Sequence, residues 1–292
     1  MRSLLRWATI SVAFLALPAT GRAQESFFDS KGVRLRYVDQ GRGQPVVLVH
    51  GLGNSLELWT TTGVLPELAK SYRVIAFDSR GQGRSEKPHD PNAYGAELAL
   101  DIVRLLDHLG IDRAHVIGFS NGANITSQLL TLRPDRFLTA VLLGGAGRWE
   151  WTPEDARLAE QIASELERDC VSRTMISRVG GTNASQPSEE DLRARSKACF
   201  ADSSHDRFAT AAIVRSRRNQ VVSAAKVSSV RVPTLAIVGE LDSNLEYVQQ
   251  LKKLRPDINL LVIKGATHAG ERGVLRQTDT IRAIRAFLAS HQ

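Results

Sequence analysis

Short apolar runs alternate along the chain with segments that have helical spacing. The runs have the length of strands and occupy residues 46–49, 74–77, 114–117, 140–143, 235–238 and 260–263. Because none of them alternates with polar residues, we expect both faces of each strand to be buried, as in a parallel sheet covered by helices. An alternating segment at 27–38 breaks at Lys31 and Gly32, which predicts a hairpin ahead of these strands.

Helical periodicity separates the strands. It is clearest in two sets of apolar residues: Leu98, Ile102, Leu105, Leu106 and Leu109, and, near the C-terminus, Ile281, Ile284, Ala286, Phe287 and Leu288. Alternating strands and helices predict an α/β fold with a mostly parallel, doubly wound sheet.

One region, residues 148–226, breaks this alternation. It has no convincing strand, but it has two helix starts, at Thr152 before Pro153 and at Ser188 three residues before Asp191. We therefore expect a helical cap insertion at 148–226 within a core formed by 24–147 and 227–292.

The first 23 residues have the order of a secretory signal. Arg2 and Arg6 precede an uncharged, mostly apolar stretch at 7–17, and small residues end the segment at Ala23. A stretch this short cannot cross the ~30 Å hydrocarbon core of a bilayer. We therefore expect a cleaved signal peptide at 1–23 and a secreted or periplasmic protein with no stable membrane anchor.

Charge does not favour a nucleic-acid partner. Removing residues 1–23 takes away three arginines and no acidic residue, so the formal net charge falls from +7 to +4. The densest basic cluster, which comprises Arg215, Arg217 and Arg218, is interpreted as a solvated face.

Two cysteines, Cys170 and Cys199, lie in the predicted insertion. Their spacing matches no zinc or redox motif, so we expect no metal site. An oxidising compartment favours a disulfide between them, and two buried thiols are the alternative.

A Gly-x-Ser-x-Gly sequence at 118–122 follows one predicted strand and precedes a helical segment. This is the pattern of a nucleophile elbow, a turn so tight that the neighbours of the serine must be small. Ser120 is therefore the candidate nucleophile, and the N-terminus of the next helix would favour a developing anion beside it.

A serine nucleophile needs a general base that is oriented by a carboxylate. Asp242 follows the strand at 235–238, and His268 follows the strand at 260–263. Functional residues in such sheets lie beyond the carboxyl ends of the strands. We therefore predict His268 as the base and Asp242 as the acid, with Glu240 as the rival acid.

A tetrahedral intermediate also needs an oxyanion hole, usually two backbone N–H groups. The predicted donors are Asn121, which follows the nucleophile, and Leu52, in the glycine-rich turn after the strand at 46–49. The turn at 78–85 contains Gly-x-Gly without a third glycine at phosphate-binding spacing, so it does not indicate a nucleotide site.

Five motifs occur in the order and spacing of the α/β-hydrolase superfamily: His50-Gly51 with Trp59 downstream, the turn at 78–85, the Ser120 elbow, 238–242 and 265–268. The chain resembles the capped, serine-esterase-like branch of that superfamily. This resemblance implies that the insertion covers the active site and that no cofactor is needed. Gln82 replaces a histidine common in the family and Ala123 a common glycine, so the subfamily and substrate stay open.

The expected function is hydrolysis of a small-molecule carboxylic ester, or of a lactone, thioester or amide, through an acyl-Ser120 intermediate. Two uses of the same triad, carbon–carbon bond hydrolysis and acyl transfer, are alternatives. A non-catalytic ligand-binding protein on the same scaffold is an alternative from another class. The cap determines the substrate, and fold-level analogy does not identify it.

Overall fold

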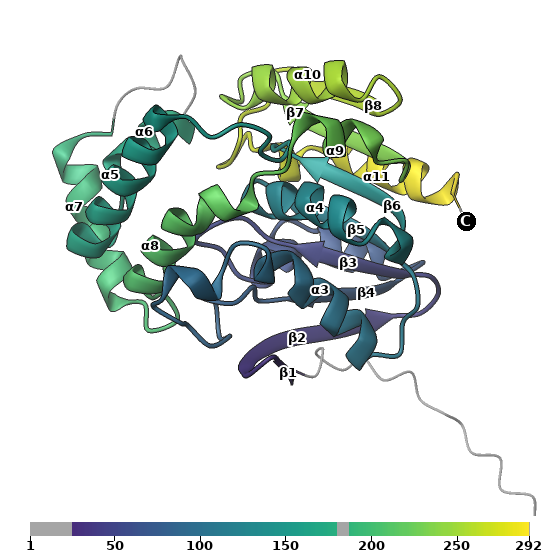
Figure 1. Cartoon of the computed structure of the whole chain (residues 1–292), viewed down its shortest axis with the longest axis horizontal. Helices are drawn as coiled ribbons and strands as arrows, with labels where there is room; N and C mark the ends of the chain where they lie inside the picture. Colours follow the sequence, from purple (N-terminus) through teal and green to yellow (C-terminus); the bar gives the residue numbers. More distant parts are fainter. Residues whose placement is uncertain (1–24, 180–186, 292) are drawn as a thin grey trace, which may run out of the picture.

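The computed structural model describes residues 25–179 and 187–291, so the predicted signal peptide at 1–23 lies outside the described residues. Its centre is an eight-stranded sheet with the order β1-β2-β4-β3-β5-β6-β7-β8 (Figure 1). The strands are β1 (Ser26–Ser30), β2 (Val33–Gly41), β3 (Pro45–Val49), β4 (Arg73–Phe77), β5 (Ala114–Phe119), β6 (Phe137–Leu143), β7 (Thr234–Gly239) and β8 (Asn259–Ile263).

The first two strands form the predicted hairpin, and β2 also pairs with β4 in antiparallel orientation. All other neighbours pair in parallel, from β4 through β3 to β8. The expectation of a mostly parallel α/β sheet is therefore confirmed.

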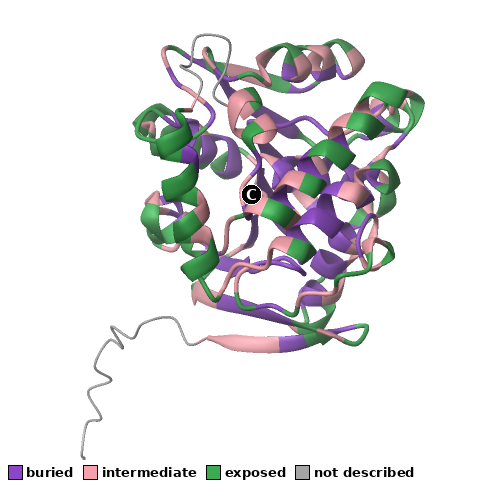
Figure 2. Cartoon of the chain, turned by 90° about the vertical axis from the view of Figure 1, so that its left-hand side faces the viewer, coloured by how far each residue is buried: buried purple, intermediate pink, exposed green. Residues whose placement is uncertain are grey.

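Helices cover both faces of the sheet. On one face α3 (Glu97–His108) and α4 (Asn121–Leu132) pack against the sheet, and on the other α1 (Glu57–Thr61), α2 (Val64–Leu68) and α11 (Thr278–Ala289) do so. Neighbouring strand residues point to opposite faces, as Val47 in the first cluster and Val46 in the second show. Buried residues accordingly concentrate in the sheet and on the helix sides that face it (Figure 2).

The last strand departs from the expected burial on both faces. In β8, Asn259 and Val262 are exposed and Leu260 and Leu261 are only partly buried. β8 is the edge strand and pairs only with β7, so the packed helices cover less of it than of the central strands. An apolar run alone does not reveal this position.

Between β6 and β7 the described residues form the helices α5 (Pro153–Asp169), α6 (Arg173–Val179), α7 (Glu189–Ala201), α8 (Arg207–Arg215), the 3₁₀ helix η3 (Ser216–Gln220) and α9 (Ala224–Ser229). α5, α6, α7 and α8 lie to one side of the sheet (left in Figure 1). α5 and α7 begin with the expected capping boxes, and α5 packs on α8 through apolar residues that include Ile162 and Val214.

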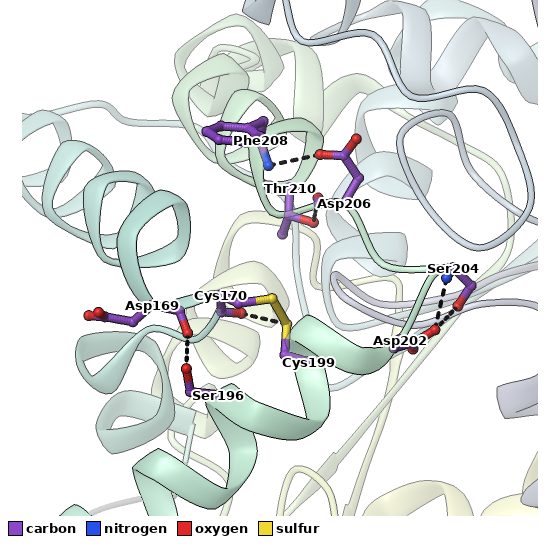
Figure 3. Close-up of a disulfide and its surroundings, with 9 residues drawn as sticks. All are labelled: Asp169, Cys170, Ser196, Cys199, Asp202, Ser204, Asp206, Phe208 and Thr210. Carbon is purple, nitrogen blue, oxygen red and sulfur yellow. Dashed lines mark hydrogen bonds between the residues drawn. A yellow bond between two sulfur atoms is a disulfide. The ribbon is translucent and has the colours of Figure 1, made fainter.

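A disulfide joins Cys170, at the end of α5, to Cys199 in α7 (Figure 3). The Ser196 hydroxyl also donates to the Asp169 carbonyl at 2.6 Å, which fastens the same two helices together. The expected disulfide is therefore confirmed.

The basic cluster at 215–218 is not a uniformly solvated face, and that interpretation is wrong for two of its members. Arg215 forms ion pairs with Glu160 and Glu167 of α5. Arg217 is partly buried and its Nε makes no hydrogen bond, whereas Arg218 is exposed. The sequence places all three close together but does not show that Arg215, at the end of α8, pairs with α5 or that η3 turns Arg217 inward.

The helices of the described residues include none that is long and apolar enough to cross a membrane.

Candidate active site

Ser120 occupies a strained turn between β5 and α4. Its φ of 55° and ψ of −117° lie where few non-glycine residues are found. The flanking glycines have no space for a side chain, because a Cβ at Gly118 would lie 2.3 Å from the Gly122 carbonyl oxygen and one at Gly122 2.1 Å from that of Val49. The small residues of the motif are thus a steric requirement.

Three predicted residues meet in a chain of hydrogen bonds. His268 Nε2 lies 2.9 Å from Ser120 Oγ, and His268 Nδ1 lies 2.8 Å from Asp242 Oδ2. An ionised carboxylate only accepts, so Nδ1–H donates to Asp242 and Nε2 is left to accept the serine hydroxyl proton. The side chains of His268 and Asp242 are 5% and 0% exposed, so the pair is shielded from solvent.

Neighbouring residues hold the pair in place. The Asn244 backbone N–H donates to Asp242 Oδ1 at 2.9 Å, and the Asn244 amide donates to the Gly144 carbonyl at 2.9 Å. The Phe119 ring stacks on the His268 imidazole with centroids 5.1 Å apart. Both oxygens of Asp242 are therefore occupied and the imidazole is fixed in orientation.

The rival acid has another partner. Glu240 Oε2 accepts a hydrogen bond from the Gly265 backbone N–H at 2.8 Å, so it fastens the loop that leads to His268. His115, a histidine within β5, forms hydrogen bonds with Thr139 and Gln44.

His50 fixes the loop that carries Leu52. Its Nε2 accepts from the Ser79 backbone N–H at 3.1 Å, so Nδ1 donates to the Gly51 carbonyl at 2.8 Å. Burial lowers the pKa of His50, which keeps the ring neutral and suited to these two roles. In a trans peptide the carbonyl of Gly51 and the N–H of Leu52 point in opposite directions. Holding the carbonyl therefore also fixes the direction of the Leu52 N–H.

The two predicted oxyanion donors are available. Within the described ranges, the backbone N–H groups of Leu52 and Asn121 donate to no protein acceptor. A Cβ at Gly51 would lie 3.2 Å from Ser120 Cβ, so the Leu52 loop passes directly beside the serine. Asn121 is the first residue of α4, where N–H groups have no partner in the helix.

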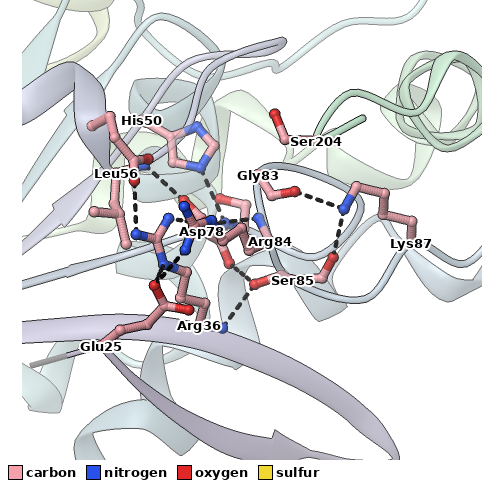
Figure 4. Close-up of polar contacts among 12 residues, drawn as sticks. Glu25, Arg36, His50, Leu56, Asp78, Gly83, Arg84, Ser85, Lys87 and Ser204 are labelled. Carbon is pink, nitrogen blue, oxygen red and sulfur yellow. Dashed lines mark hydrogen bonds and ion pairs between the residues drawn. The ribbon is translucent and has the colours of Figure 1, made fainter. Parts of the chain in front are cut away.

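The turn at 78–85 contacts and holds the loop that carries Leu52. Buried Asp78 accepts hydrogen bonds from the backbone N–H groups of Leu56 and Arg84, at 2.7 and 2.8 Å, and from the Arg36 guanidinium at 3.2 Å (Figure 4). Gln82 accepts from the Gly53 N–H. Gln82, which departs from the family pattern, thus anchors the residue after Leu52.

A polar cavity of about 240 Å³ lies between the core and the insertion. Its lining includes Gly53 and Asn54 of the Leu52 loop, Gln82, and the segment of the insertion around His205. None of the three hydrogen-bonded residues, Ser120, Asp242 and His268, lines it. The cavity adjoins the loop with the Leu52 donor but not the serine.

One group of residues has the composition of a metal site. Cys170, Cys199 and His205 bring one ligand-type atom each to within 4.8 Å of one another. Both sulfur atoms are joined in the disulfide, so neither is a thiolate that could bind zinc. The residues present there do not fit a metal.

Comparison with known proteins identifies the family. The family model described as "alpha/beta hydrolase fold" matches residues 44–270. The chain belongs to the α/β-hydrolase family. The match spans the Leu52 loop, the Ser120 elbow, the insertion, Asp242 and His268.

Individual relatives are similar over parts of this fold. The 2-hydroxymuconate semialdehyde hydrolase of Pseudomonas sp. (strain CF600) is 41% identical over 118 residues, which are 40% of this chain and 41% of that protein. The chain thus spans about two fifths of the curated relative's length.

Two solved structures are similar over nearly the whole chain. A thermophilic esterase from Thermogutta terrifontis has a TM-score of 0.74 at 24% identity and covers 92% of this chain and 100% of its own. Est816, described as an N-acyl homoserine lactone degrading enzyme, has a TM-score of 0.70 at 25% identity, with 90% and 100% covered.

Proposed function

We propose that this α/β hydrolase is a carboxylesterase-like serine hydrolase that acts on a small-molecule ester. The observation that carries the proposal is the continuous hydrogen-bond chain from Asp242 through His268 to Ser120. A strained serine, a histidine in reach and a buried carboxylate are the parts that nucleophilic catalysis by serine requires.

In this mechanism Ser120 Oγ attacks the ester carbonyl while His268 Nε2 takes the hydroxyl proton. The N–H groups of Leu52 and Asn121 stabilise the oxyanion of the tetrahedral intermediate. The protonated imidazole then gives its proton to the departing alcohol, which leaves an acyl-Ser120 ester. Water, deprotonated by His268, hydrolyses this ester and regenerates the serine, and Asp242 stabilises the imidazolium in both half-reactions.

A panel of p-nitrophenyl esters from acetate to palmitate tests this function. We expect release of p-nitrophenol from at least one chain length, and its loss in Ser120→Ala with the fold retained by circular dichroism. Turnover that is unchanged in Ser120→Ala would mean that the serine does not carry the reaction.

Carbon–carbon bond hydrolysis is the second candidate, because the relative from Pseudomonas sp. is a 2-hydroxymuconate semialdehyde hydrolase. Activity on 2-hydroxymuconate semialdehyde can be compared with activity on the best ester. A higher kcat/KM for the semialdehyde than for the best ester would show that the protein is a carbon–carbon bond hydrolase rather than an esterase.

Export is a separate part of the proposal. It rests on the order of residues at 1–23 and is supported by the disulfide, which oxidising compartments favour. We expect the exported product to begin at Gln24, as measured by intact mass. A product that retains residues 1–23 would contradict cleavage.

A further inference from the structure

Three arginines from separate segments lie within electrostatic reach of one another. They are Arg148, which follows β6, Arg178 at the end of α6, and Arg217 in η3. Burial, together with the positive charges of Arg148 and Arg178, lowers the pKa of Arg217 to about 9. Burial also lowers the pKa of Arg148, and the charge of Arg178 adds to that effect. Like charges have thus been brought together where solvation is poor.

Arg148 and Arg217 lack, among the described residues, the ion-pair partners that would normally compensate such charges. The Nε atoms of Arg148 and Arg217 are buried and make no hydrogen bond, and neither residue forms an ion pair there. Asp155 acts on Arg148 only at a distance, and its carboxylate is bonded to Thr152. Arg215 shows the contrast, since it has two glutamate partners.

The cluster lies where the insertion joins the core. Arg148 is on the segment that leaves the core, Arg217 is on the segment that returns, and the Val222 N–H donates to the Arg148 carbonyl at 2.8 Å. Gly144, four residues before Arg148, packs against Asp242 and His268. Four residues of chain span at most about 14 Å, so the backbone of Arg148 lies within about that distance of Gly144.

We propose that Arg148 and Arg217, with Arg178 beside them, bind a carboxylate on the substrate, at a distance from the ester that Ser120 attacks. This deepens the proposed function and rests on it. A guanidinium whose Nε is buried without a partner is costly, and a bound carboxylate would reduce that cost. The planar fork of arginine matches the two oxygens of a carboxylate. The substrate class is therefore esters of dicarboxylic acids or other acid-bearing esters.

The kinetic test compares two esters of equal acyl length, mono-p-nitrophenyl glutarate and the neutral p-nitrophenyl valerate. In Arg148→Gln and Arg217→Gln we expect kcat/KM for the glutarate ester to fall about tenfold or more, mainly through KM. We expect the valerate value to change by less than about twofold. Arg218→Gln, an exposed neighbour, is the matched control and should affect neither ester.

Equal losses on both esters, or no loss on the glutarate ester, would overturn the proposal. If a glutamine variant fails to fold, Arg217→Lys replaces it, since the lysine keeps the charge but loses the bidentate fork. We then still expect kcat/KM to fall for the glutarate ester and not for the valerate ester. A ratio of the two kcat/KM values equal to that of the wild type would count against the proposal.

A binding measurement separates this proposal from the proposed function. Glutarate should raise the Tm of Ser120→Ala and of its Arg218→Gln derivative, but not of its Arg217→Gln derivative. An equal rise in Tm in all three variants would overturn the site, whether or not any ester is hydrolysed.

Where an ester is hydrolysed, glutarate should inhibit the valerate reaction competitively. Inorganic phosphate that binds through Arg217 without such competition would show a free-anion site and contradict substrate recognition.

Discussion

Gly144 packs so closely against His268 that an added side chain would force its neighbours to move by a few tenths of an ångström. A Cβ at position 144 would lie 3.1 Å from His268 Nδ1 and 3.1 Å from Asp242 Oδ2, and the φ of Gly144 is +58°. The backbone after β6 therefore forms one wall of the site that holds the imidazole and the carboxylate together.

Gly144→Ala should displace this pair and lower kcat by about tenfold or more, because small misplacements of catalytic groups are costly. Gly110→Ala is the matched control, since Gly110 has a similar φ of +64° but open space around it. It should lower stability by about 1 kcal/mol without changing kcat. Steady-state kinetics and thermal denaturation measure both effects. Equal kcat values for the two variants would show that Gly144 does not support the site.

Asp242→Asn should retain the fold and lose much of kcat, about 10⁴-fold, because an amide favours the wrong imidazole tautomer. Glu240→Gln should have a far smaller effect, since Glu240 contacts the Gly265 N–H and not the imidazole. Both are measured on the best p-nitrophenyl ester. A larger loss of kcat in Glu240→Gln than in Asp242→Asn would show that Asp242 is not the acid.

Removing the disulfide with Cys170→Ser and Cys199→Ser should lower the free energy of unfolding. Closing a loop with a sequence separation of 29 residues is worth roughly 3–4 kcal/mol through the unfolded chain. Because the bond lies in the insertion, KM should change more than kcat. Thermal denaturation and kinetics test this, and two free thiols in the denatured, unreduced wild-type protein would refute the pairing.

Stability should decline with acidification through His115. Burial, with a smaller contribution from His291, lowers the pKa of His115 to about 4, below the value of 6.5 expected in the unfolded chain. The unfolded state therefore binds more protons below pH 6.5, and stability is lost progressively from there toward pH 4. His115→Gln should lose less Tm between pH 7 and pH 5 than the wild type. An equal or larger loss in the variant would contradict this assignment.

The sequence predicts the triad residues because each one lies in the turn or loop that follows the end of a strand. Ser120, Asp242 and His268 are far apart in the chain, but parallel strands end at one edge of the sheet, so local position is enough to bring them together. The capping boxes and the hairpin are likewise local signals. The prediction that Cys170 pairs with Cys199 needed only the presence of two cysteines and the expectation of export.

Features that depend on tertiary position could not be predicted in this way. The exposure of Val262 follows from the strand order, which puts β8 at the edge. The separation of Arg217 from Arg218 follows from the way η3 turns between insertion and core. The role of His50 depends on a contact with Ser79, 29 residues away, which no local pattern encodes.

Active-site labelling tests the central claim, that Ser120 is activated by His268, most directly. The native protein is treated with a fluorophosphonate, and the adduct is located by peptide mass spectrometry. We expect one adduct per chain, on Ser120, strongly slowed in His268→Ala and lost after heat denaturation. An unlabelled native protein, or an equal rate of labelling in Ser120→Ala, would contradict the account.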